Sequence, residues 1–265
     1  MLSRAGGHAG VMHASAAAGP GPQPHRRRAH AVALLLATAA VLVAGVLSAA
    51  PAAAASCGGS SPPIDRPGSV VVADSFESGS VSTYWTKTDE GDAWAGITTS
   101  GPHRGLCAGR IIVTSSSTSR ANLRRGLPSG TDEIWAVGWF RVDRQGYSGS
   151  NVPTFRFFNG SQRILDVHRA NGSGSLWLRT ASGSGSWRYV WLNRYIELHR
   201  WYRIDVHIRT SWSSSVVSVW VNGTRVYANT AYSLPASRLT TVMIGAEHVK
   251  QLGDFSVDDV VLTRL

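Results

Sequence analysis

The sequence predicts an all-β protein folded as a sandwich of two sheets, and three features support this prediction. Apolar residues recur at every second position in many short segments, which is the period of a strand with one buried face. Gly, Ser, Asn and Pro separate these segments at fairly even intervals. Helical periodicity is almost absent from the same region. Many short strands joined by turn residues are typical of an antiparallel β-sandwich.

The expected strands share a short length, β-branched or aromatic residues, and turn residues on both sides. In chain order they cover residues 70–73, 110–114, 121–124, 134–142, 154–158, 164–168, 176–179, 187–191, 203–209, 217–221, 241–245 and 255–263. In several of them one face is apolar and the other carries charged or aromatic residues. Each such strand is expected to bury its apolar face inside the sandwich.

Within residues 201–230, Asn222-Gly223 predicts a β-hairpin. Asn-Gly between two alternating runs is typical of a type I′ turn, because both central residues need a positive φ. A two-residue turn pairs Val221 with Thr224, Trp220 with Arg225, Val219 with Val226, and Ser218 with Tyr227. The hairpin then has one aliphatic face, and its other face carries Trp220, Arg225 and Tyr227.

Residues 1–56 have the composition of a secretory signal peptide. Arginines at 26–28 precede an apolar run over 31–50, and small residues follow at 52–56, which is the usual order in such signals. We expect cleavage near Ala55, with an uncleaved membrane anchor as the alternative, because roughly 20 apolar residues span a bilayer. Residues 57–68 read as a linker rich in Pro, Gly and Ser, and residues 69–265 as one domain.

Two cysteines, Cys57 and Cys107, lie beyond the signal. In an exported protein an even count predicts a disulfide, which would attach the N-terminal arm to the domain. The alternative is a lipoprotein in which Cys57 is acylated and anchors the chain to a membrane. We expect a monomer that is secreted or attached to the cell surface.

Beyond the signal, the chain carries 22 basic and 16 acidic side chains, a formal charge of +6. A basic extracellular protein favours anionic polysaccharides as partners. Nucleic acid is not expected, because the charge is modest and the chain is exported.

The polar faces of several strands share Trp, Arg, His and Asp side chains. Aromatic rings stack on sugar rings, and Arg or Asp bind hydroxyl and carboxylate groups, so these faces would form a sugar-binding groove if they lay on one side of one curved sheet. The candidate ligand-binding residues are Trp139, Arg141, Arg156, His168, Trp177, Arg179, Arg203, Asp205 and His207. The alternative is that half of them face water or a second sheet.

Five segments carry a resemblance to a known superfamily. They are WYRIDVH at 201–207, VWVNGT at 219–224, MIG at 243–245, FSVDDVVL at 255–262 and DSFESG at 74–79. Together they resemble the concanavalin A-like lectin/glucanase superfamily and, within it, the laminin-G-like domains of secreted actinobacterial proteins. The resemblance covers about residues 70–265 and implies a two-sheet antiparallel jelly-roll β-sandwich whose first and last strands pair.

The same resemblance implies a cluster of acidic residues where the first and last strands meet. It brings Asp74 and Glu77 near Asp258 and Asp259, and such clusters can hold Ca²⁺ through carboxylates and backbone carbonyls. Asp258 and Asp259 are neighbours in one strand, so their side chains are expected to point to opposite faces. At most one of them is expected to ligate a cation through its side chain, while the other caps a turn or pairs with an arginine.

Catalytic motifs are sparse. The Glu-x-Asp-x-Glu strand of the superfamily's retaining glucanases is missing, and the 16 acidic residues are scattered. The segment Arg120-Ala121-Asn122-Leu123-Arg124 is similar to the Arg-x-Glu-Leu/Val-Arg strand of alginate-lyase-like enzymes, with Asn122 where Glu usually stands. In a lyase of this kind Arg120, Asn122 and Arg124 would bind the uronate, and His168 or His207 would be the base. The Gln-Ile-His strand and the terminal Tyr- and Lys-rich motif of those enzymes are not found.

The sequence therefore favours a secreted glycan-binding jelly-roll module without a recognisable catalytic constellation. The first alternative is a polysaccharide lyase that acts on a uronate-containing glycan. The second is an extracellular protein-binding or adhesion module, because one fold hosts many functions.

Overall fold

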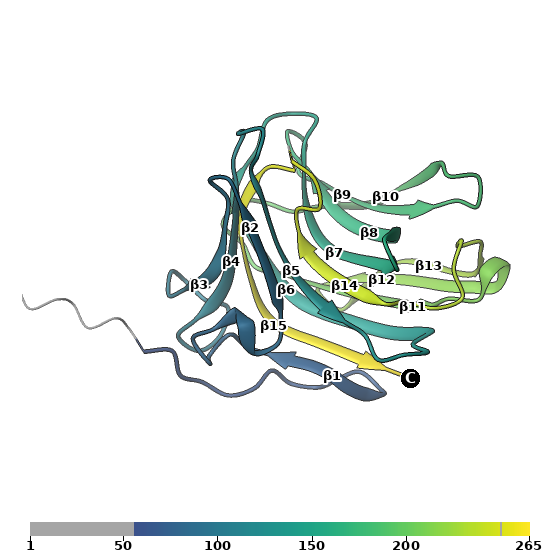
Figure 1. The fold of residues 1–265 in the computed structure, drawn as a ribbon, viewed down its shortest axis with the longest axis horizontal. Coiled ribbons are helices and arrows are strands. Elements are labelled where there is room, and N and C mark those ends of the chain that lie inside the picture. The colour runs from purple at the N-terminus through teal and green to yellow at the C-terminus, as the bar shows by residue number, and fades with distance from the viewer. Residues whose placement is uncertain (1–55, 250) are drawn as a thin grey trace, which may run out of the picture. The chain divides into compact units, whose positions relative to one another are not determined.

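The computed structural model describes residues 56–249 and 251–265, which form two antiparallel β-sheets of a jelly-roll β-sandwich (Figure 1). The signal peptide predicted for residues 1–56 lies outside the described residues except for its last one. Only two short 3₁₀ helices, η1 (Val81–Thr83) and η2 (Trp212–Ser214), interrupt the strands of this described part. No helix within it has both the length and the apolar character needed to cross a bilayer.

Sheet A has eight strands. Their order is β13 (Thr224–Tyr232), β12 (Ser215–Val221), β11 (Tyr202–Arg209), β6 (Glu133–Gln145), β15 (Gly253–Arg264), β4 (Ala108–Val113) and β3 (Trp94–Thr98), with β1 (Ser69–Asp74) paired to the second half of β15. Ser69 lies opposite Arg264, and β1 and β15 run side by side in Figure 1. The predicted pairing of the first and last strands is thus confirmed.

Sheet B has seven strands. Their order is β10 (Trp187–Tyr195), β9 (Ser175–Ala181), β8 (Gln162–Ala170), β7 (Asn151–Asn159), β14 (Thr241–Gly245), β5 (Arg120–Gly126) and β2 (Thr86–Glu90). Every strand pairing in both sheets is antiparallel. The all-β, two-sheet prediction is therefore confirmed.

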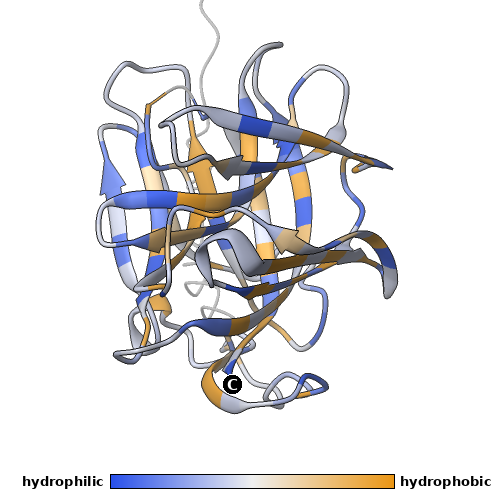
Figure 2. Cartoon of the chain, turned by 90° about the vertical axis from the view of Figure 1, so that its right-hand side faces the viewer, coloured by the Kyte–Doolittle hydropathy of each residue, from blue (hydrophilic) through white to orange (hydrophobic). Residues whose placement is uncertain are grey.

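The core lies between the sheets and is filled by the apolar face of each strand. Val206 of sheet A and Val167 of sheet B are fully buried, as are the apolar residues two positions away from each, Ile204, Ile208 and Leu165. Blue and orange segments alternate along the strands in Figure 2, as the two-residue period requires. The other face of every strand points away from this core and is therefore available for contacts with the rest of the chain or with ligands.

Two strands, β2 and β3, are not predicted by the sequence. The sequence of β2 is Thr-Lys-Thr-Asp-Glu, which has no apolar residue to mark a buried face. β2 and β3 lie at one end of their sheets, where a strand pairs on a single side. Backbone pairing to β5 and β4 forms these strands, and this pairing leaves no pattern in their own side chains.

The predicted hairpin is correct at its turn and wrong beyond it. Asn222 and Gly223 have φ of 48° and 78°, and Val221 and Trp220 pair with Thr224 and Arg225 as expected. The register then shifts by one residue, so that Val219 pairs with Tyr227 and Ser218 pairs with Ala228. This β-bulge moves Tyr227 to the core side, where it packs against the buried cluster.

Candidate functional site

The nine predicted ligand-binding residues lie on two different sheets, so the single groove expected from the sequence does not form. Trp139 and Arg141 are on β6, and Arg203, Asp205 and His207 are on β11, all on the outer face of sheet A. Arg156, His168, Trp177 and Arg179 are on β7, β8 and β9 of sheet B. Alternation correctly separates the polar face of each strand from its buried face, but it does not show which strands share a sheet.

The β11 part of the sheet A face is occupied by the segment that precedes β1. The Arg66 guanidinium donates to the buried Asp205 carboxylate and lies 4.9 Å from the ring centre of Trp135 and 5.6 Å from that of Trp220. Arg203 forms ion pairs with Asp205 at 2.8 Å and with Asp65 at 2.7 Å. The predicted linker of residues 57–68 therefore binds across sheet A.

The remaining predicted residues of sheet A are also held by the chain itself. The His207 ring stacks on Trp135 with centroids 4.3 Å apart, and its Nε2 lies 2.7 Å from the Glu133 carboxylate. His103, from the loop between β3 and β4, stacks on Trp139 at 3.8 Å.

Arg141 is similarly occupied. It is paired with Asp143 at 2.7 Å and donates to the backbone oxygens of Ser100 and Gly101. The polar residues of this face therefore stabilise the fold through intramolecular contacts.

A disulfide between Cys57 and Cys107, the residue before β4, attaches the N-terminal arm to the domain, as predicted. Beside it, the Glu77 carboxylate accepts hydrogen bonds from the backbone N–H groups of Gly58, Leu106 and Cys107. Because Cys57 is bonded in this way, its thiol is not left for acylation.

The four predicted calcium ligands each have partners within the chain. Asp74 accepts from the Phe76 backbone N–H and the Trp85 indole N–H, both at 2.8 Å, and Glu77 holds the disulfide region as described above. Asp258 accepts from the backbone N–H groups of His103 and Arg104, and Asp259 pairs with their side chains. Within residues 56–249 and 251–265, no group of three or more His, Cys, Asp or Glu residues is arranged to hold a metal ion.

Burial raises the pKa of two of these acids. The effect on Asp74 opposes the hydrogen bonds from Phe76 and Trp85. For Asp258, burial and, to a smaller extent, the neighbouring Asp259 charge outweigh its backbone hydrogen bonds and raise the pKa to about 7. The side chain of Asp259 pairs with Arg104. The expectation that Asp258 and Asp259 point to opposite faces is wrong, because both contact residues 103–104. Asp259 has a φ of 49° and lies where the register of β15 shifts, so the alternation of side chains is broken there.

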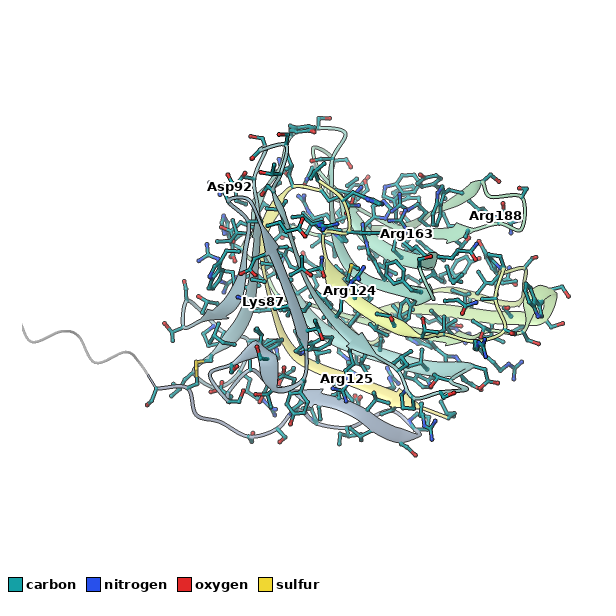
Figure 3. All side chains as sticks on the ribbon, viewed as in Figure 1. Lys87, Asp92, Arg124, Arg125, Arg163 and Arg188 are labelled. Carbon is teal, nitrogen blue, oxygen red and sulfur yellow. A yellow bond between two sulfur atoms is a disulfide. The ribbon has the colours of Figure 1, made fainter. Side chains whose placement is uncertain are left out.

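The outer side chains of sheet B form a second polar surface, which we call the sheet-B face. One row of cross-strand neighbours runs across all seven strands: Thr86, Arg124, Met243, Arg156, Asp166, Arg179 and Tyr189. A second row joins His168, Trp177 and Trp191 on β8, β9 and β10. Arg124 and Arg163 are labelled on β5 and β8 in Figure 3. The sheet-B face therefore has arginines at its centre and aromatic rings at the β10 edge.

Asp166 is the centre of the charged part of this face. Its buried carboxylate accepts from Arg179 Nε and Nη2 at 2.9 and 2.6 Å and from His168 Nδ1 at 2.8 Å, and it lies 3.2 Å from Arg163 Nε. Burial alone would raise the pKa of Asp166, but the hydrogen bond from His168 and the charges of Arg156 and Arg179 more than offset this and hold the pKa below its usual range. Asp166 is therefore an acceptor, and it fixes the Nδ1–H tautomer of His168.

Arg156 is fully buried, like Asp166. Its guanidinium has no solvent exposure, and burial lowers its pKa to about 9. Nη1 lies 2.9 Å from the Gln251 side-chain oxygen and 3.4 Å from the Glu247 carboxylate. Glu247 also accepts from Arg163 Nη1 at 2.5 Å. The loop between β14 and β15 thus supplies the second carboxylate of the cluster.

The β10 edge carries exposed aromatic rings. Tyr189 is 54% exposed, Trp191 45% and Tyr195 58%, and Trp191 packs edge-on against Tyr195. Trp187 joins these rings to the charged cluster, because Arg163 and Arg179 lie 4.4 and 5.0 Å from its ring centre. The alternating aromatics at 187, 189 and 191 were a signal for this face in the sequence, whereas nothing in the sequence pointed to Glu247.

The residues of the predicted lyase set are only partly brought together. Arg120, Asn122 and Arg124 lie on β5 and His168 lies on β8, all on sheet B, whereas His207 is on sheet A. β14 and β7 separate β5 from β8, which corresponds to roughly 14 Å at about 4.8 Å per strand spacing. Asn122 is buried and donates to the Ala246 carbonyl at 2.7 Å.

A surface pocket of ≈ 450 Å³ lies beside the β2–β5 end of the face. It is lined by Glu90, Ser117, Thr118, Arg120, Glu247, His248 and Val249. Glu247 therefore has the arginine cluster on one side and open space on the other.

Three solved structures with the same fold belong to proteins whose names refer to carbohydrates. The chain resembles an endo-β-1,4-glucuronan lyase from the fungus Trichoderma reesei, with a TM-score of 0.56 and 13% identity over 68% of this chain and 91% of the lyase. It also resembles the cellulose induced protein Cip1, with a TM-score of 0.56 and 13% identity over 72% of this chain and 96% of Cip1.

Domain 4 of AbnA, a GH43 extracellular arabinanase from Geobacillus stearothermophilus solved with arabinotriose, gives a TM-score of 0.55 at 12% identity over 75% of this chain and 94% of that one. No family model and no curated protein matches the sequence. The chain therefore shares the jelly-roll β-sandwich fold of these three structures.

Proposed function

We propose that this chain is a glycan-binding module and that its ligand lies across the sheet-B face. The observation behind this proposal is that the exposed Tyr189, Trp191 and Tyr195 rings lie beside the arginine cluster, whose guanidinium groups are themselves largely buried. Exposed rings stack on the faces of sugars, and guanidinium groups bind hydroxyl and carboxylate oxygens. Within residues 56–249 and 251–265, these three rings remain about half exposed, and exposed apolar patches of this kind mark interaction sites.

The contrast with sheet A favours this choice of face. On sheet A, Trp135 is contacted by Arg66, Trp139 by His103, Arg203 by Asp65 and Arg141 by the backbone of residues 100–101. A ligand would have to displace these contacts before it could bind there. On the sheet-B face, the aromatic rings of β10 are already exposed.

Two of the similar structures support a carbohydrate ligand by analogy. One contains arabinotriose, and the other is an enzyme named for its action on β-1,4-glucuronan. We further propose an extracellular location, which the predicted signal peptide and the disulfide support.

Calorimetric titration of the purified protein with defined oligosaccharides tests the proposal. Suitable probes are cellohexaose and the matching β-1,4-glucuronan hexamer. Tyr189→Ala and Trp191→Ala should each weaken binding roughly tenfold, the loss of one aromatic contact.

Trp212→Ala is the matched control, because Trp212 is 59% exposed but lies in η2, beside sheet A. We expect this control to bind both probes as the unchanged protein does. Equal losses in the Trp191 and Trp212 variants, or no binding of either probe, would contradict the proposal.

A uronate lyase is the second candidate function, and the Asp166–His168 pair favours it. Asp166 holds Nδ1 of His168, which leaves Nε2 as the nitrogen that could remove the C5 proton of a uronate. The C5–H electron pair would form the C4=C5 double bond as the C4–O bond breaks, and the departing O4 would take a proton from water. Arg156, on the neighbouring strand β7, would stabilise the carboxylate. The test is absorbance at about 235 nm, where the unsaturated product absorbs, on incubation with β-1,4-glucuronan. Product formation that is lost in His168→Ala would support this candidate, and no absorbance change would reject it.

A further inference from the structure

We propose that Arg156 and Arg163 form a subsite for a uronate carboxylate, and that Glu247 occupies this subsite when no glycan is bound. The inference rests on the proposed glycan-binding function, and it assigns the chemical class of the ligand and the residue that competes with it. Three independent features of the described residues support it: the contacts of Glu247, the unpaired nitrogens of Arg156 and the pocket beside them.

The contacts of Glu247 are those that a bound carboxylate would make. One oxygen, Oε2, bridges the two arginines, at 2.5 Å from Arg163 Nη1 and 3.4 Å from Arg156 Nη1. Guanidinium groups bind carboxylates through charge-assisted hydrogen bonds of this kind. Glu247 lies in a loop rather than in the sheet, so its side chain can leave without breaking a strand pairing.

Two of the hydrogen-bond donor nitrogens of Arg156 are unpaired within the described residues. Its Nε and Nη2 are buried and find no acceptor among residues 56–249 and 251–265, although its side chain has no solvent exposure. A buried donor without a partner costs free energy, typically about 1–3 kcal/mol. A uronate carboxylate that replaced Glu247 could accept from these two nitrogens, which neither Gln251 nor Glu247 reaches.

The balance of charges in the cluster also supports a carboxylate subsite. Three guanidinium groups, those of Arg156, Arg163 and Arg179, share two carboxylates, Asp166 and Glu247. Asp166 is committed to the sheet by its hydrogen bonds with Arg179 and His168. Glu247 is therefore the exchangeable anion, and a uronate that replaced it would leave the charge balance of the arginines unchanged.

The pocket beside the cluster has room for the displaced Glu247 side chain and for part of the sugar. Glu247 lines it together with Arg120 and His248, and the pocket measures ≈ 450 Å³. The Glu247 side chain is 16% exposed, so it already reaches solvent on this side. A neutral sugar lacks the carboxylate needed to displace Glu247 and would bind through the aromatic rings alone.

The experiment compares two glycans with the same linkage. β-1,4-Glucuronan hexamer carries a carboxylate at C6 of each ring, and cellohexaose carries a hydroxymethyl group there. Glu247→Gln keeps the size of the side chain and removes the competing charge. We expect this variant to bind the glucuronan hexamer roughly tenfold more tightly than the unchanged protein does, with cellohexaose binding unchanged.

Two further variants identify the cause. Glu133→Gln removes an equal charge on sheet A, where Glu133 pairs with His207, and it should leave both affinities unchanged. In the Arg163→Gln background, Glu247→Gln should no longer tighten glucuronan binding, because one arginine of the subsite is gone. Thermal unfolding of each variant shows whether it is folded at the titration temperature.

The outcomes separate this inference from the proposed function. No binding of either hexamer, or binding that is insensitive to Trp191→Ala, would overturn both. Binding that depends on Trp191 but is not tightened by Glu247→Gln, or is tightened equally for both hexamers, would overturn the carboxylate subsite and leave the glycan-binding function standing. A gain that persists in the Arg163→Gln background would overturn the assignment of Arg163.

Discussion

The outer faces of the two sheets have similar side chains and different environments. Both combine Trp, Arg, His and Asp, and each contains a fully buried aspartate paired with two arginines: Asp205 with Arg66 and Arg203, and Asp166 with Arg163 and Arg179. On sheet A, the N-terminal arm and the loop before β4 contact these residues. On sheet B, the cluster leads to exposed aromatic rings.

The difference shows that composition alone does not identify a binding surface. Alternating Trp and Arg residues are equally useful for holding a chain segment and for holding a sugar, because both use stacking and charge-assisted hydrogen bonds. Which role applies depends on whether the chain returns to cover the face. We therefore expect substitutions on sheet A to affect stability, and substitutions at the sheet B edge to affect binding.

The largest effect is expected from Asp205→Ala on sheet A. This change leaves Arg66 and Arg203 without their shared, fully buried carboxylate, and breaking a buried pair in this way costs about 4 kcal/mol. Denaturant unfolding measures the loss, and glycan affinity at a temperature where the variant is folded should be unchanged. Asp65→Ala, whose side chain is 45% exposed, is the control and should cost much less. A loss of glycan affinity in folded Asp205→Ala would contradict the division of roles.

A comparable effect is expected from removing the disulfide. Cys57 and Cys107 are 50 residues apart in the sequence, and opening a loop of this length costs about 4 kcal/mol through the entropy of the unfolded chain. Unfolding of Cys57→Ser/Cys107→Ser should occur at lower denaturant concentration, with glycan affinity retained. Reductant should shift the unchanged protein by the same amount and leave the double variant unaffected. Weaker glycan binding after reduction would place part of the site on the N-terminal arm.

The two sheets should also differ in their dependence on pH. Burial raises the pKa of Asp258 to about 7, so its protonated form is favoured in the folded state. The stability from this group is complete below its ordinary pKa of 3.8 and declines as the pH rises to about 7. The decline is about 4 kcal/mol, because each pH unit between the two pKa values costs about 1.4 kcal/mol. Asp258→Asn should remove this decline in unfolding free energy measured between pH 4 and pH 7.

Asp166 provides the comparison on sheet B. Its pKa lies below the ordinary value because the hydrogen bond from His168 and the neighbouring arginines outweigh burial. Its contribution is therefore complete above about pH 4, and Asp166→Asn should leave the slope between pH 4 and pH 7 as it is. Equal slopes in the unchanged protein and in Asp258→Asn would show that another group causes the decline.

Much of this arrangement follows from the sequence, and the parts that do not have identifiable causes. The alternation of apolar and polar residues identifies the buried faces of β8 and β11, because the apolar face of each strand packs in the core. It misplaces Tyr227 because an extra residue at Val226 shifts the register of β13. Strict alternation would place Arg163 and Asp166, three positions apart, on opposite faces of β8. A similar register shift in β8 puts both on the outer face, where they pair.

Other parts of the site depend on contacts between distant segments. The contact of Arg66 with Asp205 spans 139 residues, and that of Glu247 with Arg163 spans 84. No local pattern specifies either, because they depend on which strands are neighbours and on where loops cross them. For this reason the fold could be predicted from the sequence, whereas the division of the candidate residues between two faces could not.

The smallest effect on stability is expected at the edge of sheet B, where the effect on binding should be large. Tyr189 and Trp191 are 54% and 45% exposed on β10, a strand that pairs only with β9 in the sheet. Replacing either with Ala removes little buried area and should cost about 0.5 kcal/mol, the range of surface strand substitutions. If these substitutions change the unfolding free energy little but weaken glycan binding, the role of Tyr189 and Trp191 is recognition rather than packing. If unfolding instead shows a loss comparable to that of Asp205→Ala, these rings stabilise the sandwich, and the two faces do not differ in role.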